Sequence, residues 1–159
     1  MNDQNFTLTI NVNKPASEVY KAITNVRDWW SQEVEGDTDK QGAVFYYHYK
    51  DLHNCVLKVA DLQPSKKVVW HVLYNHFSFV KDEKEWTGDE IVFEINEKGD
   101  KTEVKFTHFG LTPKYECYGA CSEGWGNYIL GSLKDLIETG KGEPNVGEAQ
   151  TKSEAKHEK

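Results

Sequence analysis

The chain opens with an alternation of apolar and polar residues. Over residues 5–13 every second position is apolar, at Phe6, Leu8, Ile10 and Val12. A period of two is typical of a strand that buries one face, so we predict a first strand here. Apolar residues then recur at helical spacing over residues 16–25, directly after Pro15, which suits an opening helical turn.

Two tryptophans follow this first helix in a further short segment, residues 26–32. Trp29 and Trp30 are adjacent, and neighbours on a helix do not face the same way. We therefore expect a second short helical segment in which one of the two indoles enters the core.

Five further segments have strand-like patterns, at residues 42–49, 55–62, 67–74, 90–96 and 102–109. Residues 63–66 contain a proline suited to a turn, and residues 97–101 are polar with one glycine, so each joins a hairpin. Residues 75–89 mix charges with aromatic residues without a clear period. That segment is predicted to be a long loop or a frayed strand near an opening.

Residues 113–138 form the longest helical pattern, which at about 1.5 Å per residue would span roughly 40 Å. Its apolar positions recur at threes and fours and include Tyr118, Cys121, Trp125, Ile129, Leu133 and Leu136. Thr112 and Pro113 suit its start and Gly140 its end. Such a stripe requires a concave apolar partner, which the predicted sheet can supply.

After the helix the sequence becomes polar, with balanced charges and no apolar periodicity. Such a segment cannot bury enough surface to order itself, so we expect one domain over residues 1–142 and a disordered tail over residues 143–159. The predicted fold class is α+β: a curved antiparallel sheet of about six strands around a long C-terminal helix, with two short helices after the first strand.

The composition of the chain excludes several classes of function. With 19 Lys and Arg against 26 Asp and Glu, the net charge is −7, and scattered lysines argue against nucleic-acid binding. We find no export signal and no run of eighteen apolar residues, so we expect a cytoplasmic protein without membrane association. Three cysteines, Cys55, Cys117 and Cys121, form no framework and are expected to be reduced, packed thiols.

Three stretches carry a resemblance to a known family: NVNKPASEVYKAITNVRDWW, TEVKFTHFGL and EGWGNYILGSLKDLIETG. They resemble the activator of heat-shock protein 90 ATPase homologue family within the START-like (SRPBCC) helix-grip superfamily, over residues 6–140. The resemblance implies a curved sheet gripping the C-terminal helix with a cavity between them. It gives Trp125 and His108 the best claim to line that cavity, and it transfers no catalytic residue.

Candidate chemistry is sparse. Cys117 and Cys121 have a spacing that would place two thiolates on one metal, with His108 upstream, but no third and fourth ligands appear at recognisable spacing. We therefore expect neither metal nor cofactor. His108 alternates with Val104 and Phe106 and should face inward, as a structural, ligand-orienting or acid–base residue. No phosphate loop, HExxH or GxSxG motif occurs.

The aromatic content is the remaining signal. Part of it is ordinary core packing, and part fits an apolar pocket with a few polar groups. Our candidate cavity residues are Tyr47, Tyr49, Trp70, Phe93, Phe106, His108, Tyr118, Cys121 and Trp125.

Three functions remain open. Binding of a small apolar or aromatic molecule needs only the cavity that the fold implies. A protein-interaction or cochaperone-like role, regulating a chaperone ATPase, would need an exposed apolar patch. An enzyme of the cyclase, dehydratase or hydrolase kind would need a placed acid or base with a shifted pKa, and we favour a non-enzyme.

Overall fold

The computed structural model describes residues 5–31, 34–49, 53–77, 86–112 and 118–144. A six-stranded antiparallel sheet forms most of it, in the order β1-β6-β5-β4-β3-β2. The strands are β1 (Phe6–Val12), β2 (Val44–Tyr49), β3 (His53–Gln63), β4 (Lys67–Phe77), β5 (Glu90–Lys98) and β6 (Lys101–Phe109). The predicted strand number and both hairpins are confirmed, and β1 pairs with the last strand of the meander.

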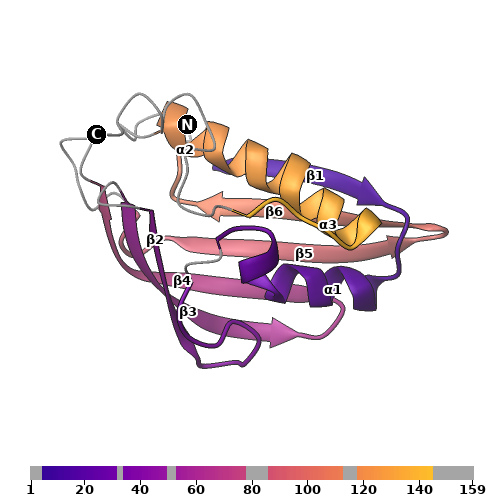
Figure 1. The fold of residues 1–159 in the computed structure, drawn as a ribbon, viewed down its shortest axis with the longest axis horizontal. Coiled ribbons are helices and arrows are strands. Elements are labelled where there is room, and N and C mark those ends of the chain that lie inside the picture. Colours follow the sequence, from indigo (N-terminus) through magenta and orange to yellow (C-terminus); the bar gives the residue numbers. More distant parts are fainter. Residues whose placement is uncertain (1–4, 32–33, 50–52, 78–85, 113–117, 145–159) are drawn as a thin grey trace.

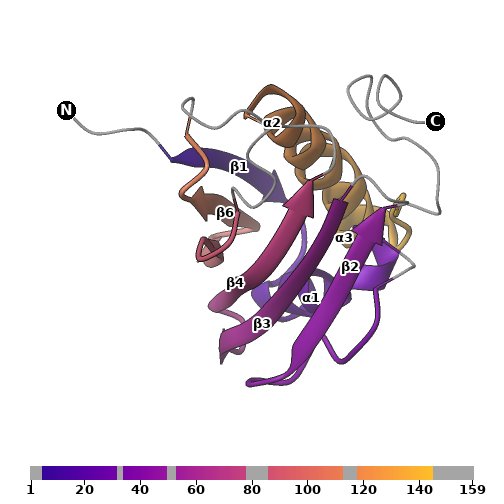
Figure 2. The same cartoon turned by 90° about the vertical axis from the view of Figure 1, so that its left-hand side faces the viewer.

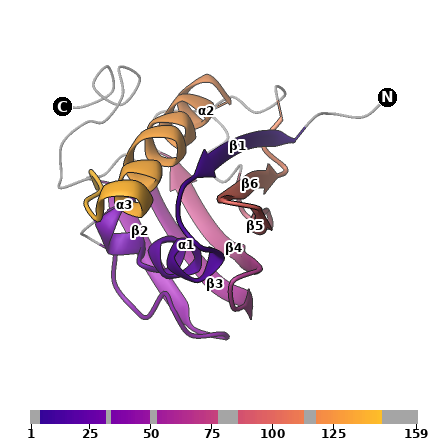
Figure 3. The same ribbon diagram turned by 90° about the vertical axis from the view of Figure 1, so that its right-hand side faces the viewer.

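One long helix crosses the inner face of this sheet (Figure 1). It comprises α2 (Tyr118–Gly126), a π-helical segment η2 (Asn127–Leu133) and α3 (Lys134–Thr139). Seen from the two ends, the sheet curves around the helix (Figures 2 and 3). The helix-grip architecture predicted from the sequence is therefore confirmed.

The ends of the helix agree in part with the sequence prediction. Gly140 closes it in the left-handed conformation, with φ 85°, and donates its N–H to the Leu136 carbonyl, as expected of a helix-terminating glycine. The predicted start at residues 113–117 lies outside the described residues. The π-helical segment was not predicted, because an apolar stripe alone does not reveal a wider turn.

Two short helices follow β1, as predicted: α1 (Ala16–Thr24) and the 3-10 turn η1 (Val26–Asp28). In Figure 1, α1 lies beside α3, at the end of the long helix far from α2. Glu97, in β5, accepts a hydrogen bond from the Ala16 N–H at 2.8 Å and so attaches the start of α1 to the sheet. These short helices close one end of the space between sheet and long helix.

The core lies between the inner face of the sheet and the helix. Inward positions along the strands are fully buried, among them Phe45, Leu57, Trp70, Ile91 and Phe106. The helix contributes Trp125, Ile129, Leu133 and Ile137. Alternating strand residues and one helix stripe thus meet as the sequence pattern predicts.

Candidate ligand-binding site

Aromatic side chains line the space between sheet and helix. Trp70, Phe93 and Phe106 come from three adjacent strands, and their ring centroids lie 5.1 and 5.2 Å apart in succession. Trp125 reaches down from α2 to Phe106, at 4.8 Å. The structure therefore brings together several candidates that are far apart in the sequence.

Trp29 and Trp30 join this lining, and the expectation that only one enters the core is wrong. Both are buried, and their rings stack at 6.3 Å with 20° between the planes. Trp29 donates its indole N–H to the Ile23 carbonyl at 3.0 Å, while Trp30 stacks on the predicted residue Tyr47 at 4.4 Å. The pair follows the η1 turn rather than lying within a helix, so the rule for helical neighbours does not apply.

The remaining predicted residues have different surroundings. Tyr118 is partly buried against Phe6 at 6.3 Å, edge to face. The side chain of Tyr49 lies outside the described residues. Cys121 is buried but disulfide-bonded, which corrects the prediction of a reduced thiol, and its partner lies outside the described residues. Cys55 is a free, buried thiol, as expected.

A polar chain runs through one corner of this lining. Trp125 donates its indole N–H to His108 Nδ1 at 3.1 Å, and His108 Nε2 lies 2.8 Å from Asp89 Oδ2. An indole N–H only donates, so Nδ1 must be the acceptor and Nε2 must carry the proton that is donated to Asp89. His108 is thus held as one neutral tautomer.

The pKa of His108 agrees with that tautomer. Burial lowers this pKa below the ordinary value of 6.5, while the hydrogen bond and charge of Asp89 act in the opposite direction. Both ring nitrogens are occupied, so neither is available to take a proton from a substrate in this arrangement. Of the three predicted roles, the structural role fits this geometry best, because a ligand-orienting role would also need a free ring nitrogen.

The network depends on residues that the sequence analysis missed. Trp86 packs edge-on against His108 at 4.7 Å and stacks on Trp125 at 5.6 Å, 11° from parallel. Gly110, with φ 107°, leaves the space that the Asp89 carboxylate occupies, because a Cβ at this position would collide with that carboxylate. Trp86 and Asp89 fall in the segment without periodicity, so no pattern indicated them.

Two buried donors on β4 have no hydrogen-bond partner among the described atoms. They are Trp70 Nε1 and Asn75 Nδ2, and both side chains are 0% exposed. Leaving such a donor unpaired costs about 1–3 kcal/mol, so unpaired donors call for an explanation. Asn75 was not a predicted site residue, because it follows the alternating part of the strand.

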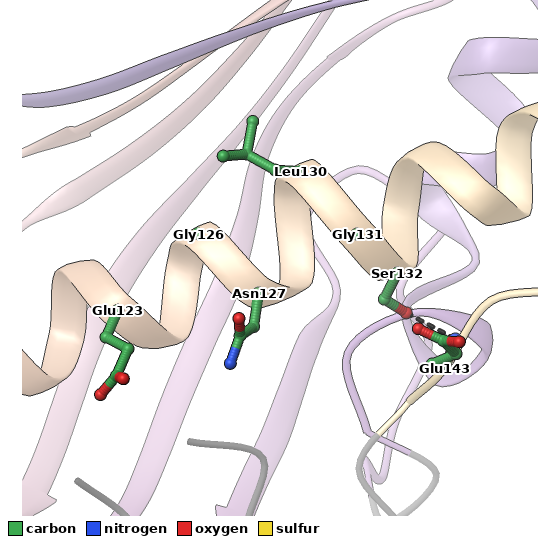
Figure 4. A pocket seen from close by; sticks show the side chains of 7 residues that line it. All are labelled: Glu123, Gly126, Asn127, Leu130, Gly131, Ser132 and Glu143. Atoms are coloured by element: carbon green, nitrogen blue, oxygen red, sulfur yellow. Dashed lines mark hydrogen bonds between the residues drawn. The ribbon is translucent and has the colours of Figure 1, made fainter. Parts of the chain in front are cut away.

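A separate surface pocket lies on the outward side of the long helix (Figure 4). Gly126, Leu130 and Gly131 line this pocket. Glu123 and Glu143 also line it and give it negative charge. No described atom lies within 4 Å of a Cβ placed at Gly126 or Gly131, so close packing does not explain these glycines. The pocket shares no lining residue with the aromatic space.

The described part of the chain contains neither a cluster of metal ligands nor a helix suited to span a membrane. No three His, Cys, Asp or Glu side chains there lie close enough together to hold a metal ion. None of the helices described has the length and apolar character needed to cross a membrane.

Known proteins resemble the chain over most of its length. The structure of the Aha1 dimer from Colwellia psychrerythraea matches with TM-score 0.70 and 26% identity, covering 87% of this chain and 99% of the other. DynU16, described as a putative protein in the dynemicin biosynthetic locus, matches with TM-score 0.67 and 17% identity, covering 89% of this chain and 49% of the other. CalU16 from Micromonospora echinospora matches with TM-score 0.62 and 17% identity, covering 86% and 75%.

No curated protein matches the chain. The family model described as "Activator of Hsp90 ATPase homolog 1-like protein" matches residues 13–138, which is most of the chain and includes all but the last residue of the long helix. The chain therefore belongs to the family of activator of Hsp90 ATPase homologue 1-like proteins, as its sequence resemblance predicted.

Proposed function

We propose that this protein binds a small apolar or aromatic molecule between the inner face of the sheet and the long helix. The observation that carries the proposal is the aromatic lining together with its unpaired indole donor, Trp70 Nε1. Small-molecule sites are mostly apolar, with a few polar groups that fix orientation. A ligand acceptor would relieve the cost of burying this donor alone.

The helix geometry supports the same location. The π-helical segment η2 begins two residues after Trp125, and π-helical turns occur frequently at functional sites. Trp125 tilts 46° from Trp30 and 51° from Phe106, so these rings are not stacked in parallel. Since the described rings contact one another, we expect a ligand to enter by shifting them, with Trp125 and Trp86 moving most.

Titration with N-phenyl-1-naphthylamine, an uncharged fluorescent aromatic probe, tests this proposal. Energy transfer from the tryptophans should rise to saturation at one probe per chain. Trp125→Ala should weaken binding about tenfold or more while Leu130→Ala, on the outward side of the same helix, should leave it unchanged. The proposal would be contradicted if energy transfer in the parent protein did not saturate. It would also be contradicted if Trp125→Ala and Leu130→Ala weakened probe binding equally.

A second candidate, protein binding, is favoured by the outer face of the sheet. Tyr46 and Tyr74 are both register partners of Val56, so the three residues form one row across β2, β3 and β4. Both tyrosines are exposed, as are the nearby Val44 and Leu73. Exposed apolar patches of this kind mark interaction sites.

Self-association is the simplest form of this second function, and the relative from Colwellia psychrerythraea is described as a dimer. Light scattering during size exclusion should then give a dimer mass for the parent and a monomer mass for the double variant Tyr46→Lys, Tyr74→Lys. A monomeric parent at every concentration would remove the argument for self-association.

A further inference from the structure

Asn75 is the one fully buried asparagine among the described residues. It lies on β4 opposite Cys55 of β3, and Cys55 in turn lies opposite Tyr47 of β2. All three side chains are buried on the inner face. Asn75 is therefore part of the same inner surface as the aromatic lining.

The orientation of its amide group is determined by its neighbours. Asn75 Oδ1 accepts the Trp86 backbone N–H at 2.8 Å and the Thr87 hydroxyl at 3.3 Å. A backbone N–H can only donate, so the atom facing Trp86 must be the oxygen. The amide cannot flip without losing these bonds, and Nδ2 must point away from residues 86 and 87.

Nδ2 has no acceptor among the described atoms. Two buried acceptors of the polar chain already have donors, because His108 Nδ1 receives the N–H of the Trp125 indole and Asp89 Oδ2 receives the N–H of His108. A primary amide in a dry environment loses its bonds to water, at a cost comparable to that of one or more hydrogen bonds. The protein thus presents an oriented donor that its own described residues do not use.

The charge around this donor limits what it can bind. Burial raises the pKa of the Cys55 thiol, which lies opposite Asn75, and the negative charge of Asp89 raises it further. An anionic ligand would be repelled by the same charge and would pay a large cost for leaving water. A neutral acceptor such as a carbonyl oxygen meets neither penalty.

We propose that Asn75 Nδ2 donates a hydrogen bond to a neutral carbonyl oxygen of the bound ligand, which makes the ligand an aromatic ketone or a related aromatic carbonyl compound. This inference rests on the proposed ligand-binding function and names the chemistry of the ligand. In the proposed complex the aromatic rings contact the hydrocarbon part of the ligand, and Asn75 sets its orientation.

Fluorene and 9-fluorenone provide the test, since both are flat tricyclic molecules and only the ketone has an acceptor. Each is titrated into the full chain and followed by tryptophan fluorescence quenching. Fluorenone should bind about fivefold or more tightly than fluorene, the gain expected for one neutral hydrogen bond of about 1 kcal/mol. Fluorene-9-carboxylate should bind more weakly than both.

Asn75→Asp, measured at pH 8, keeps an oxygen for Trp86 and Thr87 but replaces the Nδ2 donor. The preference for fluorenone over fluorene should then fall to about one. Asn127→Asp is the matched control, because Asn127 is exposed on the outward side of the helix, and it should keep the full preference.

The outcomes separate the two proposals. Equal binding of fluorene and fluorenone by the parent protein would overturn the role of Asn75 while leaving the apolar site intact. Tighter binding of the carboxylate would overturn the neutral-acceptor assignment. Failure of all three compounds to bind would count against the proposed function itself. If Asn75→Asp does not fold, equal binding of fluorene and fluorenone by the parent protein would still overturn the role of Asn75.

Discussion

Trp125 and His108 are joined by a hydrogen bond of 3.1 Å that connects the long helix to the last strand. Because the indole can only donate, this bond exists only while His108 Nδ1 carries no proton. Protonating the histidine would place two N–H groups against each other. The bond therefore ties the charge of one residue to the packing of the helix on the sheet.

Stability should accordingly depend on pH through His108. Its pKa is lowered in the folded state, so between that value and 6.5 the unfolded chain binds more protons. The stabilisation is complete above 6.5 and is lost as the pH falls toward the folded-state pKa. Urea unfolding at pH 8, 7, 6 and 5 should show this decrease in the parent.

The variant His108→Gln should lack this part of the pH dependence. His71→Gln is the control, because His71 is partly exposed on β4 and its neighbour Glu90 lies at 3.9 Å. The decrease in the free energy of unfolding that comes from His108 should persist in His71→Gln. The same slope in His108→Gln and the parent would show that His108 does not titrate as described.

Removing Trp125 should destabilise the fold strongly. This side chain is 2% exposed and contacts Trp30, Trp86 and Phe106. Trp125→Ala should cost about 3–5 kcal/mol by urea unfolding if the surrounding space is close-packed. A smaller loss with a clear loss of probe binding would instead indicate that Trp125 lines a partly empty site.

Trp125→Phe separates packing from hydrogen bonding at the same position. It keeps an aromatic ring but leaves His108 Nδ1 without a donor, so it should cost about 1–3 kcal/mol. Leu130→Ala, on the exposed side of the helix, should change stability by no more than about 0.5 kcal/mol. Equal stability of Trp125→Phe and the parent would show that the bond to His108 contributes little.

Gly110 should tolerate no side chain. Gly110→Ala places a methyl group against the Asp89 carboxylate and also strains the backbone at φ 107°. Gly88→Ala is the matched control, since φ is 92° there and no described atom lies within 4 Å of the added Cβ. Both should lose about 1–3 kcal/mol from backbone strain, and Gly110→Ala should lose clearly more. Equal midpoint temperatures of thermal unfolding for the two variants would show that the Asp89 side chain moves aside freely.

Ser132 connects the helix to two other segments. Its hydroxyl donates to the Trp29 carbonyl at 2.8 Å and accepts the Glu143 N–H at 2.7 Å, in a buried position. Ser132→Ala should cost about 1–3 kcal/mol, because it leaves both partners unpaired. Ser122→Ala removes a bond to Gly119 within the same helix at a less buried site and should cost less. The reverse order in denaturant unfolding would contradict this description.

Local periodicity predicted most of the fold. Alternation in β1, β5 and β6 and the stripe through Trp125 and Ile129 indicated which side faces inward. These patterns work because burial on one face repeats every two residues in a strand and every three to four in a helix. The fold that the family resemblance implied has the same order of strands and helices as the one predicted from periodicity.

The site was predictable only in part. His108 and Trp125 were identified, but their partners Asp89 and Trp86 come from a segment without repeat, held by contacts that depend on the folded sheet. Asn75 was missed for a related reason, since β4 has an irregular register opposite β3 between Val56 and Leu57. Beyond such a bulge, strict alternation no longer predicts which face a residue occupies.

The π-helical segment also lets the helix hold more residues than a regular α-helix of the same phase. Trp125, Ile129, Leu133 and Ile137 are spaced by four, and four residues of a regular α-helix overshoot a full turn by about 40°. The wider turn at Asn127–Leu133 reduces this drift, so all four side chains remain on the sheet. Deleting one residue here, for example the exposed Leu130, would let the wide turn become a regular α-helix, and the shortened segment from Trp125 to Ile137 would then turn by about 1,100°, close to three full turns. Ile137 would stay on the core, so this helix can lose one residue at its wide turn without turning its apolar face away from the sheet.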